Sequence, residues 1–158
     1  MITLRLAYCA ALSAAFCAVA VTPALAQSHT VIASSFADPA DVAAYRKCVA
    51  SGASSTSCLA IGDNGIGKWG DDTTSLTPMC ALPREDWQER WGKGNAARGK
   101  KIRVSYEAKT VICELRDTMP ARAKRHNPAG IDLNPGAASA FGWKPPFMVK
   151  DVKWEWAE

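Results

Sequence analysis

The alternation of apolar and polar residues predicts β-strands in several parts of the chain. In Val111–Leu115 every second side chain is apolar, a period near two that fits a strand with one face in a core. Val149–Trp156 follows the same rule, with a valine and two tryptophans on one face and a lysine and a glutamate on the other. Lys101–Tyr106 also has strand character, and we expect it to pair with Val111–Leu115. Thr30–Phe36 is expected to form the first strand.

Helical patterns are fewer and shorter. Asp38–Val49 places its apolar residues on one side at helical spacing and begins with Asp-Pro. A second helix has well-defined ends, because Asn134 is a good N-cap, Pro135 suits the first helical position, and Gly142 stops the alanine-rich segment between them. Glu85–Trp91 is predicted to form a helical turn.

Two aspartates stand at the ends of these predicted elements. Asp117 follows the point where the strand Val111–Leu115 runs out, and Asp132 lies just before the helix that begins at Asn134. Two carboxyl groups can act as proton donor and as base or nucleophile in the cleavage of a glycosidic bond. We therefore take Asp117 and Asp132 as candidate catalytic residues.

The surrounding motifs resemble a known family. Asp117 begins an Asp-x-x-Pro motif, and after a loop the chain continues with Ile-Asp-Leu-Asn-Pro-x-Ala-Ala around Asp132, a stop at Gly142 and a closing strand. This order resembles the double-psi β-barrel domain of the rare lipoprotein A, expansin and barwin group, over Val31 to Trp156. The resemblance implies a mainly β fold, a six-stranded double-psi β-barrel with short helices in a single domain.

The resemblance also implies roles for the two aspartates. In lytic members of the rare lipoprotein A family the aspartate of the Asp-x-x-Pro motif is implicated in catalysis, and Asp117 matches it. In expansins and family 45 glycoside hydrolases the essential acid is the aspartate that Asp132 matches. Lytic members also carry a histidine where Thr77–Pro83, expected to be a rigid connection, has Cys80 and no histidine. This departure counts against peptidoglycan cleavage.

Structural roles for the same carboxylates are equally open. Asp132 can be stabilised by the free amides and the dipole of a helix N-terminus. Asp117 can pair with Arg116 or Arg122, or accept bonds from backbone amides. Sequence alone does not separate these roles from catalysis.

The glycine-rich stretch Gly62–Gly70 predicts a tight loop with an exposed backbone. Its spacing matches neither a P-loop nor a dinucleotide fingerprint, so we expect no nucleotide or other cofactor. In the family the corresponding stretch lines one wall of an open groove, which implies substrate contacts for Trp69, Asp71 and Asp72. Trp69 has little apolar company nearby in the sequence, so we expect its ring to stack on a sugar.

The first 26 residues predict a secretory signal peptide. Arg5 precedes an apolar run, and Ala24-Leu25-Ala26 provides a small-x-small cleavage site. The apolar run is short for a membrane span. We expect residues 27–158 to form one exported domain, secreted or periplasmic, monomeric and free of the membrane once the signal is removed.

The remaining cysteines predict disulfides. Cys48, Cys58, Cys80 and Cys113 are an even set in an exported chain, and three pairings are possible. We favour Cys48–Cys58, which brackets a loop, with Cys80–Cys113, which ties a loop to the core strand. A zinc site is the alternative, but the chain lacks a Cys-x-x-Cys motif and a histidine pair beside these cysteines, so no metal is expected.

The formal net charge of +4 is too small to indicate nucleic-acid binding. Basic residues do gather in one loop around Arg122. A solvated loop explains them, and contact with an acidic wall polymer is the alternative, so Arg122 is included among the candidate substrate-binding residues.

Three functions from different classes fit these observations. The first is binding of peptidoglycan or another wall polysaccharide in a groove that bears Asp117, Asp132 and Trp69, without cleavage. The second is a weak peptidoglycan lytic transglycosylase or glycosidase. The third is a secreted inhibitor or effector that binds a protein, and the absence of a row of aromatic side chains in the groove would favour it.

Overall fold

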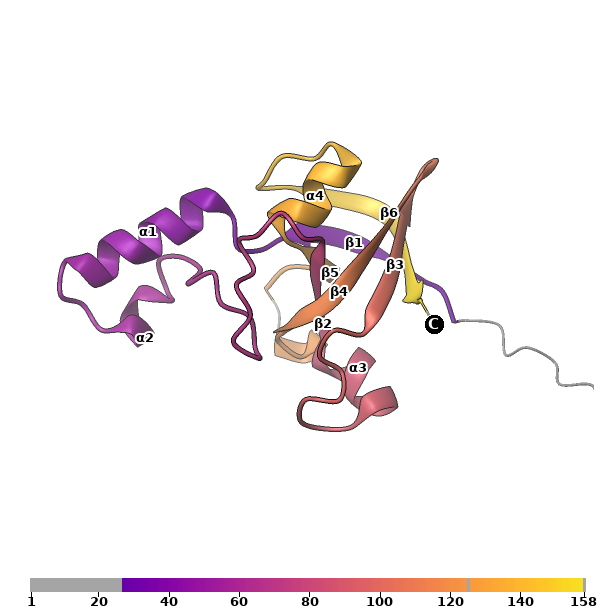
Figure 1. Cartoon of the computed structure of the whole chain (residues 1–158), viewed down its shortest axis with the longest axis horizontal. Helices are drawn as coiled ribbons and strands as arrows, with labels where there is room; N and C mark the ends of the chain where they lie inside the picture. Colours follow the sequence, from indigo (N-terminus) through magenta and orange to yellow (C-terminus); the bar gives the residue numbers. More distant parts are fainter. Residues whose placement is uncertain (1–26, 125, 158) are drawn as a thin grey trace, which may run out of the picture.

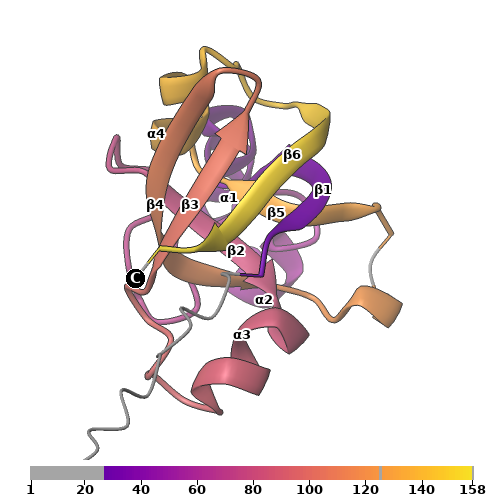
Figure 2. The same cartoon turned by 90° about the vertical axis from the view of Figure 1, so that its right-hand side faces the viewer.

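Six strands close into a barrel in the computed structural model, which describes residues 27–124 and 126–157. The predicted signal peptide lies outside these residues. The strands follow one another around the barrel in the order β1-β5-β2-β4-β3-β6 (Figure 2). Their bounds are β1 His29–Ser35, β2 Met79–Pro83, β3 Lys101–Tyr106, β4 Lys109–Met119, β5 Ala129–Leu133 and β6 Met148–Trp156. The prediction of a mainly β, six-stranded barrel is confirmed.

Neighbouring strands run antiparallel except in two pairs. β1 pairs with β5 and β2 pairs with β4 in parallel, while β2·β5, β3·β4, β3·β6 and β1·β6 are antiparallel. Parallel partners need long connections. The longest segment outside the barrel strands lies between β1 and β2, which are not paired with each other.

The barrel interior is filled from alternate positions of its strands, as the sequence pattern predicts. Val152, Trp154 and Trp156 of β6 are buried, and so are Ile102 and Val104 of β3. The helix α3, Arg84–Trp91, lies at one end of the barrel and contributes the fully buried Trp87. The helix α4, Pro135–Phe141, lies at the other end (Figure 1).

Two predicted boundaries were wrong. Met79–Pro83, expected to be part of a rigid connection, is the strand β2, and all of its residues are buried. Burial on both faces removes the period-two pattern that reveals a strand, and Pro78 precedes the segment while Pro83 is its last residue. β4 continues beyond Leu115 to Met119, so Asp117 lies inside a strand and not after its end.

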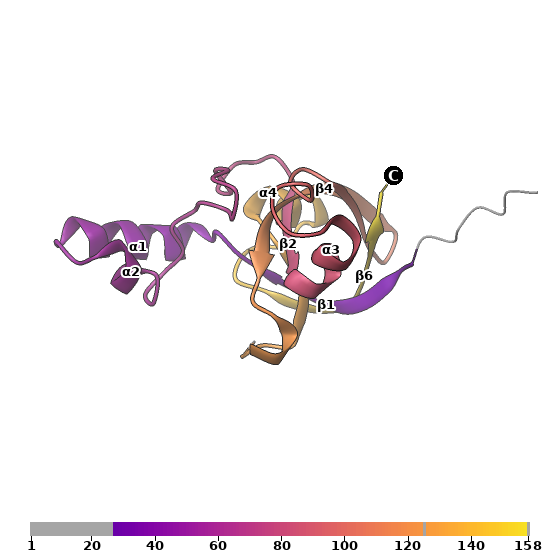
Figure 3. The ribbon, with the colours of Figure 1, turned by 90° about the horizontal axis from the view of Figure 1, so that it is seen from below.

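The connection between β1 and β2 begins with an arm that projects from the barrel (Figures 1 and 3). It consists of α1, Pro39–Ala50, and α2, Ser55–Cys58. The Cys48–Cys58 disulfide joins the two helices, with 5.6 Å between the Cα atoms. The arm thus has a covalent brace of its own, and the predicted helix at 38–49 is confirmed.

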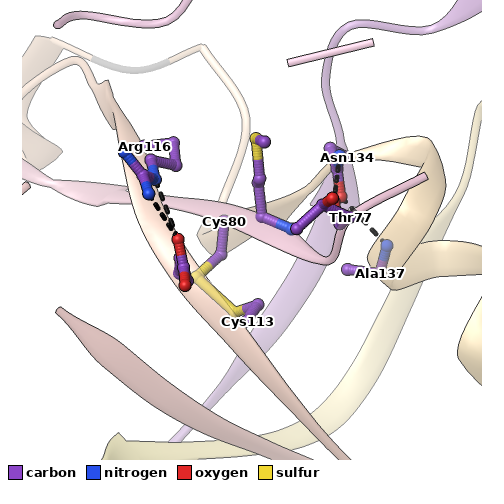
Figure 4. Close-up of a disulfide and its surroundings, with 8 residues drawn as sticks. Thr77, Cys80, Cys113, Arg116, Asn134 and Ala137 are labelled. Carbon is purple, nitrogen blue, oxygen red and sulfur yellow. Dashed lines mark hydrogen bonds and ion pairs between the residues drawn. A yellow bond between two sulfur atoms is a disulfide. The ribbon is translucent and has the colours of Figure 1, made fainter. Parts of the chain in front are cut away.

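The second predicted disulfide, Cys80–Cys113, joins β2 to β4 inside the barrel (Figure 4). Both cysteines are fully buried. The pairing favoured from the sequence is therefore the one in the structure. Among the described residues, no helix has the length and apolar character needed to cross a membrane.

Asn134 connects three parts of the fold. It is fully buried, and its side-chain oxygen accepts hydrogen bonds from the amides of Ala137 (2.9 Å) and Met79 (2.8 Å). Its side-chain nitrogen lies 3.0 to 3.1 Å from the carbonyl oxygens of Thr73, Ser75 and Thr77. Figure 4 shows Asn134 beside Thr77 and Ala137. One side chain thus caps α4, holds the start of β2 and fastens the end of the long connection.

We expect Asn134→Ala to lower the free energy of unfolding by about 3–5 kcal/mol, because it leaves several buried amide and carbonyl groups without a partner. Asn134→Asp should cost a similar amount, since an ionised carboxylate accepts from the amides but donates nothing to the carbonyls. Denaturant unfolding followed by tryptophan fluorescence measures both changes.

Asn64→Ala is the matched control for this prediction. Asn64 accepts a single exposed bond from the amide of Ile66, so its loss should cost about 1 kcal/mol or less. Equal, small losses at both asparagines would contradict the connecting role of Asn134.

Candidate functional site

The two predicted aspartates lie on the outer face of the barrel, on either side of one small residue. Ala81 of β2 pairs with Asp117 of β4 and also with Asp132 of β5. Ser34 of β1 continues the row beyond Asp132. Because neighbouring strands are about 4.8 Å apart, the backbones at the two aspartates are separated by roughly 10 Å. The fold thus brings together two residues that the sequence singles out.

Asp117 fastens the long connection to the barrel. Its Oδ1 accepts hydrogen bonds from the amides of Lys68 (2.8 Å) and Thr118 (2.7 Å). A register shift in the β2·β4 pairing, between Cys80 and Ala81, turns Asp117 outward. Burial raises the pKa of the Asp117 carboxyl above its ordinary value and outweighs the two amide bonds, which lower it.

Asp132 is held differently. It lies within β5, where its neighbours Ile131 and Leu133 point into the core, and it accepts a hydrogen bond from the Ser34 hydroxyl. The N-cap of the following helix is Asn134, as the sequence predicts. Asp132 is therefore a half-buried strand residue with a hydroxyl partner.

A cleft of about 660 Å³ opens between the arm, the long connection and the outer end of β4. Its wall is formed by Asp41, Leu59, Ala60, Ile61, Gly62, Asp63, Asn64, Ile66, Lys68, Asp117 and Thr118. Asp117 lines this cleft and Asp132 does not. Segment 59–68 supplies most of the wall, and we call it the cleft loop.

The cleft loop is fixed by hydrogen bonds and close packing. Asp63 accepts bonds from the amides of Ala37 (3.1 Å) and Gly65 (2.7 Å). A Cβ at Gly67 would come within 2.3 Å of the Arg116 carbonyl oxygen, so only glycine allows this approach to the barrel. The loop therefore has a defined shape although it contains no helix or long strand.

Three aliphatic side chains of this loop are more exposed than is usual. Leu59 is 54 % exposed, Ile61 60 % and Ile66 50 %. Large apolar side chains held in water beside one cleft are typical of binding surfaces. Sequence reasoning missed these residues. The available indication was a set of aliphatic residues close to and within a glycine-rich stretch.

The remaining sequence candidates have partners within the protein. Trp69, which we expected to stack on a sugar, has contacts within the fold: its ring packs edge-on against Trp87 at 5.6 Å, and its N–H donates to the Gly94 carbonyl. Asp71 forms ion pairs with Arg98 (2.6 Å) and Arg116 (3.0 Å).

Asp72 and Arg122 also have polar partners within the protein. Asp72 accepts bonds from the amide and hydroxyl of Thr74, and these bonds lower the pKa of its carboxyl. Arg122 forms an ion pair with Asp86. Within the described part of the chain, histidine, cysteine and acidic side chains do not gather in a group of three that could hold a metal ion.

Comparison with known proteins identifies the fold. No family profile and no curated protein sequence matches the chain. Among solved structures, the Streptomyces papain inhibitor is similar, with a TM-score of 0.51 and 20 % sequence identity, over 84 % of this chain and 96 % of the inhibitor. At this identity the likeness shows a shared barrel fold.

Asp117→Asn should leave the protein as stable as the wild type at neutral pH, or more stable. The amide oxygen can still accept both backbone bonds, and a neutral side chain avoids the cost of desolvating a charge. Burial raises the pKa of Asp117 in the folded state, so ionisation of its carboxyl destabilises the fold. This destabilisation is complete at pH values above the pKa of the folded state and absent at pH values below the pKa of the unfolded state. The difference in melting temperature should therefore shrink as the pH falls toward about 4.

Two further variants check this interpretation. Asp117→Ala removes the acceptor of two amides and should cost about 1–3 kcal/mol across the same pH range. Asp72→Asn should slightly destabilise the protein at neutral pH, because the pKa of that carboxyl is lowered. A clear loss of stability in Asp117→Asn would show that its charge serves the fold.

Proposed function

We propose that this chain is an exported protein-binding barrel of the secreted inhibitor class, and that the cleft loop is its contact surface. The observation that carries the proposal is the exposure of Leu59, Ile61 and Ile66 on a loop of fixed shape. A fixed loop loses little conformational entropy when it docks, so its apolar contacts contribute more to affinity. The two disulfides are typical of proteins that leave a reducing compartment.

The tryptophans support protein binding over sugar binding. Each of the six packs against another ring of the fold, in the contacts Trp69–Trp87, Trp91–Trp156, Trp154–Trp156 and Trp143–Phe141. The large apolar side chains that the described residues do expose are valine, leucine, isoleucine and one methionine, and none is aromatic. A sugar-binding groove needs flat aromatic faces, whereas a protein interface accepts leucine and isoleucine.

The structural neighbour suggests the kind of partner. The Streptomyces papain inhibitor shares the barrel fold with this chain, and its name gives papain, a cysteine protease, as its target. A fold hosts many functions, so the likeness does not transfer that activity by itself. Together with the exposed cleft loop, it makes a papain-type cysteine protease the first partner to test.

Polysaccharide binding with weak cleavage is the second candidate. The raised pKa of Asp117, at the edge of a cleft, suits a proton donor. Membership of the rare lipoprotein A, expansin and barwin group would place Asp117 and Asp132 in a glycan groove. Asp117 lies in the cleft, while Asp132 is bonded to Ser34 outside the cleft lining.

The exported protein should inhibit papain in a saturable, stoichiometric manner, with trypsin and subtilisin as controls for protease class. It should not be retained on insoluble peptidoglycan, chitin or cellulose. Leu59→Ser combined with Ile61→Ser should weaken inhibition at least about tenfold, because truncation of a central interface side chain costs more than 1 kcal/mol.

Ile112→Ser is the matched control, since Ile112 is 41 % exposed on β4 and does not line the cleft. It should inhibit as the unmodified protein does. Retention on a glycan with release of soluble fragments, lost in Asp117→Asn and without protease inhibition, would establish the second candidate instead.

A further inference from the structure

We propose that the cleft binds a basic segment of its partner protein, with a lysine or arginine side chain entering beside an aliphatic one. This inference rests on the protein-binding function proposed above and specifies the chemistry of the segment that is bound. It is carried by the combination of an exposed apolar wall and unpaired negative charge in one cleft.

The charge of the cleft is opposite in sign to that of the chain. The whole sequence has a formal net charge of +4, whereas the cleft wall contains Asp41, Asp63 and Asp117 against a single cation, Lys68. An acidic cleft on a basic protein attracts a cationic group and repels an anionic one. Uronic or teichoic acids are therefore poor occupants.

Among the described residues, the carboxylates of the cleft form none of the close ion pairs that acidic groups elsewhere form, and the Lys68 charge acts on Asp117 without such a pair. Asp71, Asp86 and Glu114 each form an ion pair with an arginine. Within residues 27–124 and 126–157, no lysine or arginine side chain forms an ion pair with Asp41, Asp63 or Asp117. An incoming cation would thus gain attraction without breaking an existing pair.

Asp117 and Asp41 can meet such a cation directly. Both backbone bonds to Asp117 end on Oδ1, which leaves Oδ2 available to the cleft. Asp41 is exposed on the first turn of α1. Asp63 uses both oxygens to hold the loop, so it contributes charge and not a free acceptor.

The apolar wall explains why the occupant should be a peptide and not a lone amine or metal ion. Leu59, Ile61 and Ile66 offer aliphatic surface to the same cleft. Lysine and arginine carry long aliphatic stems below their charged groups, and those stems bind apolar surface. A basic residue flanked by leucines therefore complements both the charge and the wall.

The test uses three fluorescein-labelled peptides that differ only in a central residue between two leucines: lysine, norleucine or glutamate. Fluorescence anisotropy with the exported protein measures each affinity at low and at high salt. The lysine peptide should bind about 10- to 100-fold more tightly than the norleucine peptide, as for one charge-assisted hydrogen bond. High salt should reduce this preference.

Asp41→Asn combined with Asp117→Asn should remove the preference for lysine. Both changes keep the side-chain shape, and Asp117→Asn keeps the backbone bonds of the loop. Glu89→Gln, an exposed carboxylate on α3 outside the cleft, is the control and should leave the preference intact.

Equal binding of the three peptides, tighter binding of the glutamate peptide, or no binding of the lysine peptide would overturn the inference. So would displacement of the lysine peptide by glucosamine oligomers, which would assign the cation to an amino sugar. If the double Asn variant inhibits papain as well as the unmodified protein, the proposed function stands and this inference fails. Lysine preference without inhibition of papain or the control proteases would leave the cleft chemistry standing and refute the inhibitor role.

Discussion

The Asn134 side chain forms hydrogen bonds with backbone groups of three segments at once. The attachment of the long connection and of α4 to the barrel depends on these bonds. The amides of Met79 and Ala137 donate to its oxygen, while its two side-chain N–H groups are shared among three carbonyl oxygens of segment 73–77. Without it, a connection that crosses the barrel surface would bury polar groups with no partner. This single buried amide replaces a ladder of hydrogen bonds that the segment cannot form.

Side chains also satisfy backbone groups elsewhere in the long connection between β1 and β2. Its shape is set by side-chain oxygens that accept backbone amides, from Asp63, Asn64, Asp72 and Asp117. Such turns need only a few residues, and their hydrogen bonds hold the loop in one conformation. Asp117 joins this system to the barrel, since its carboxylate reaches from β4 to the amide of Lys68. Through this bond the barrel fixes the position of the cleft wall.

Regular patterns were predictable from the sequence, and their interruptions were not. β3 and β6 have one buried face, so their alternation is visible, and Asn134, Pro135 and Gly142 define α4 unambiguously. β2 was missed because burial on both sides erases the alternation.

The candidate site was only partly predictable, for reasons of long-range packing. The outward turn of Asp117 depends on a register shift that only the pairing with β2 reveals. The packing of Trp69 was not visible in the sequence because its apolar neighbour, Trp87, comes from a different segment of the chain. The proposed contact surface depends on the exposure of Leu59, Ile61 and Ile66. Their exposure is set by how the arm and the barrel are arranged in space, which the sequence pattern does not show. The sequence singles out Asp117, which lines the cleft, and the chemistry open to its carboxyl depends on the groups around it. Beside a free second carboxylate it would suit acid–base chemistry. In this cleft it lies among exposed aliphatic side chains and two further aspartates, while Asp132 is bonded to Ser34, an arrangement that fits the proposed cation site better than catalysis by a pair of carboxyl groups.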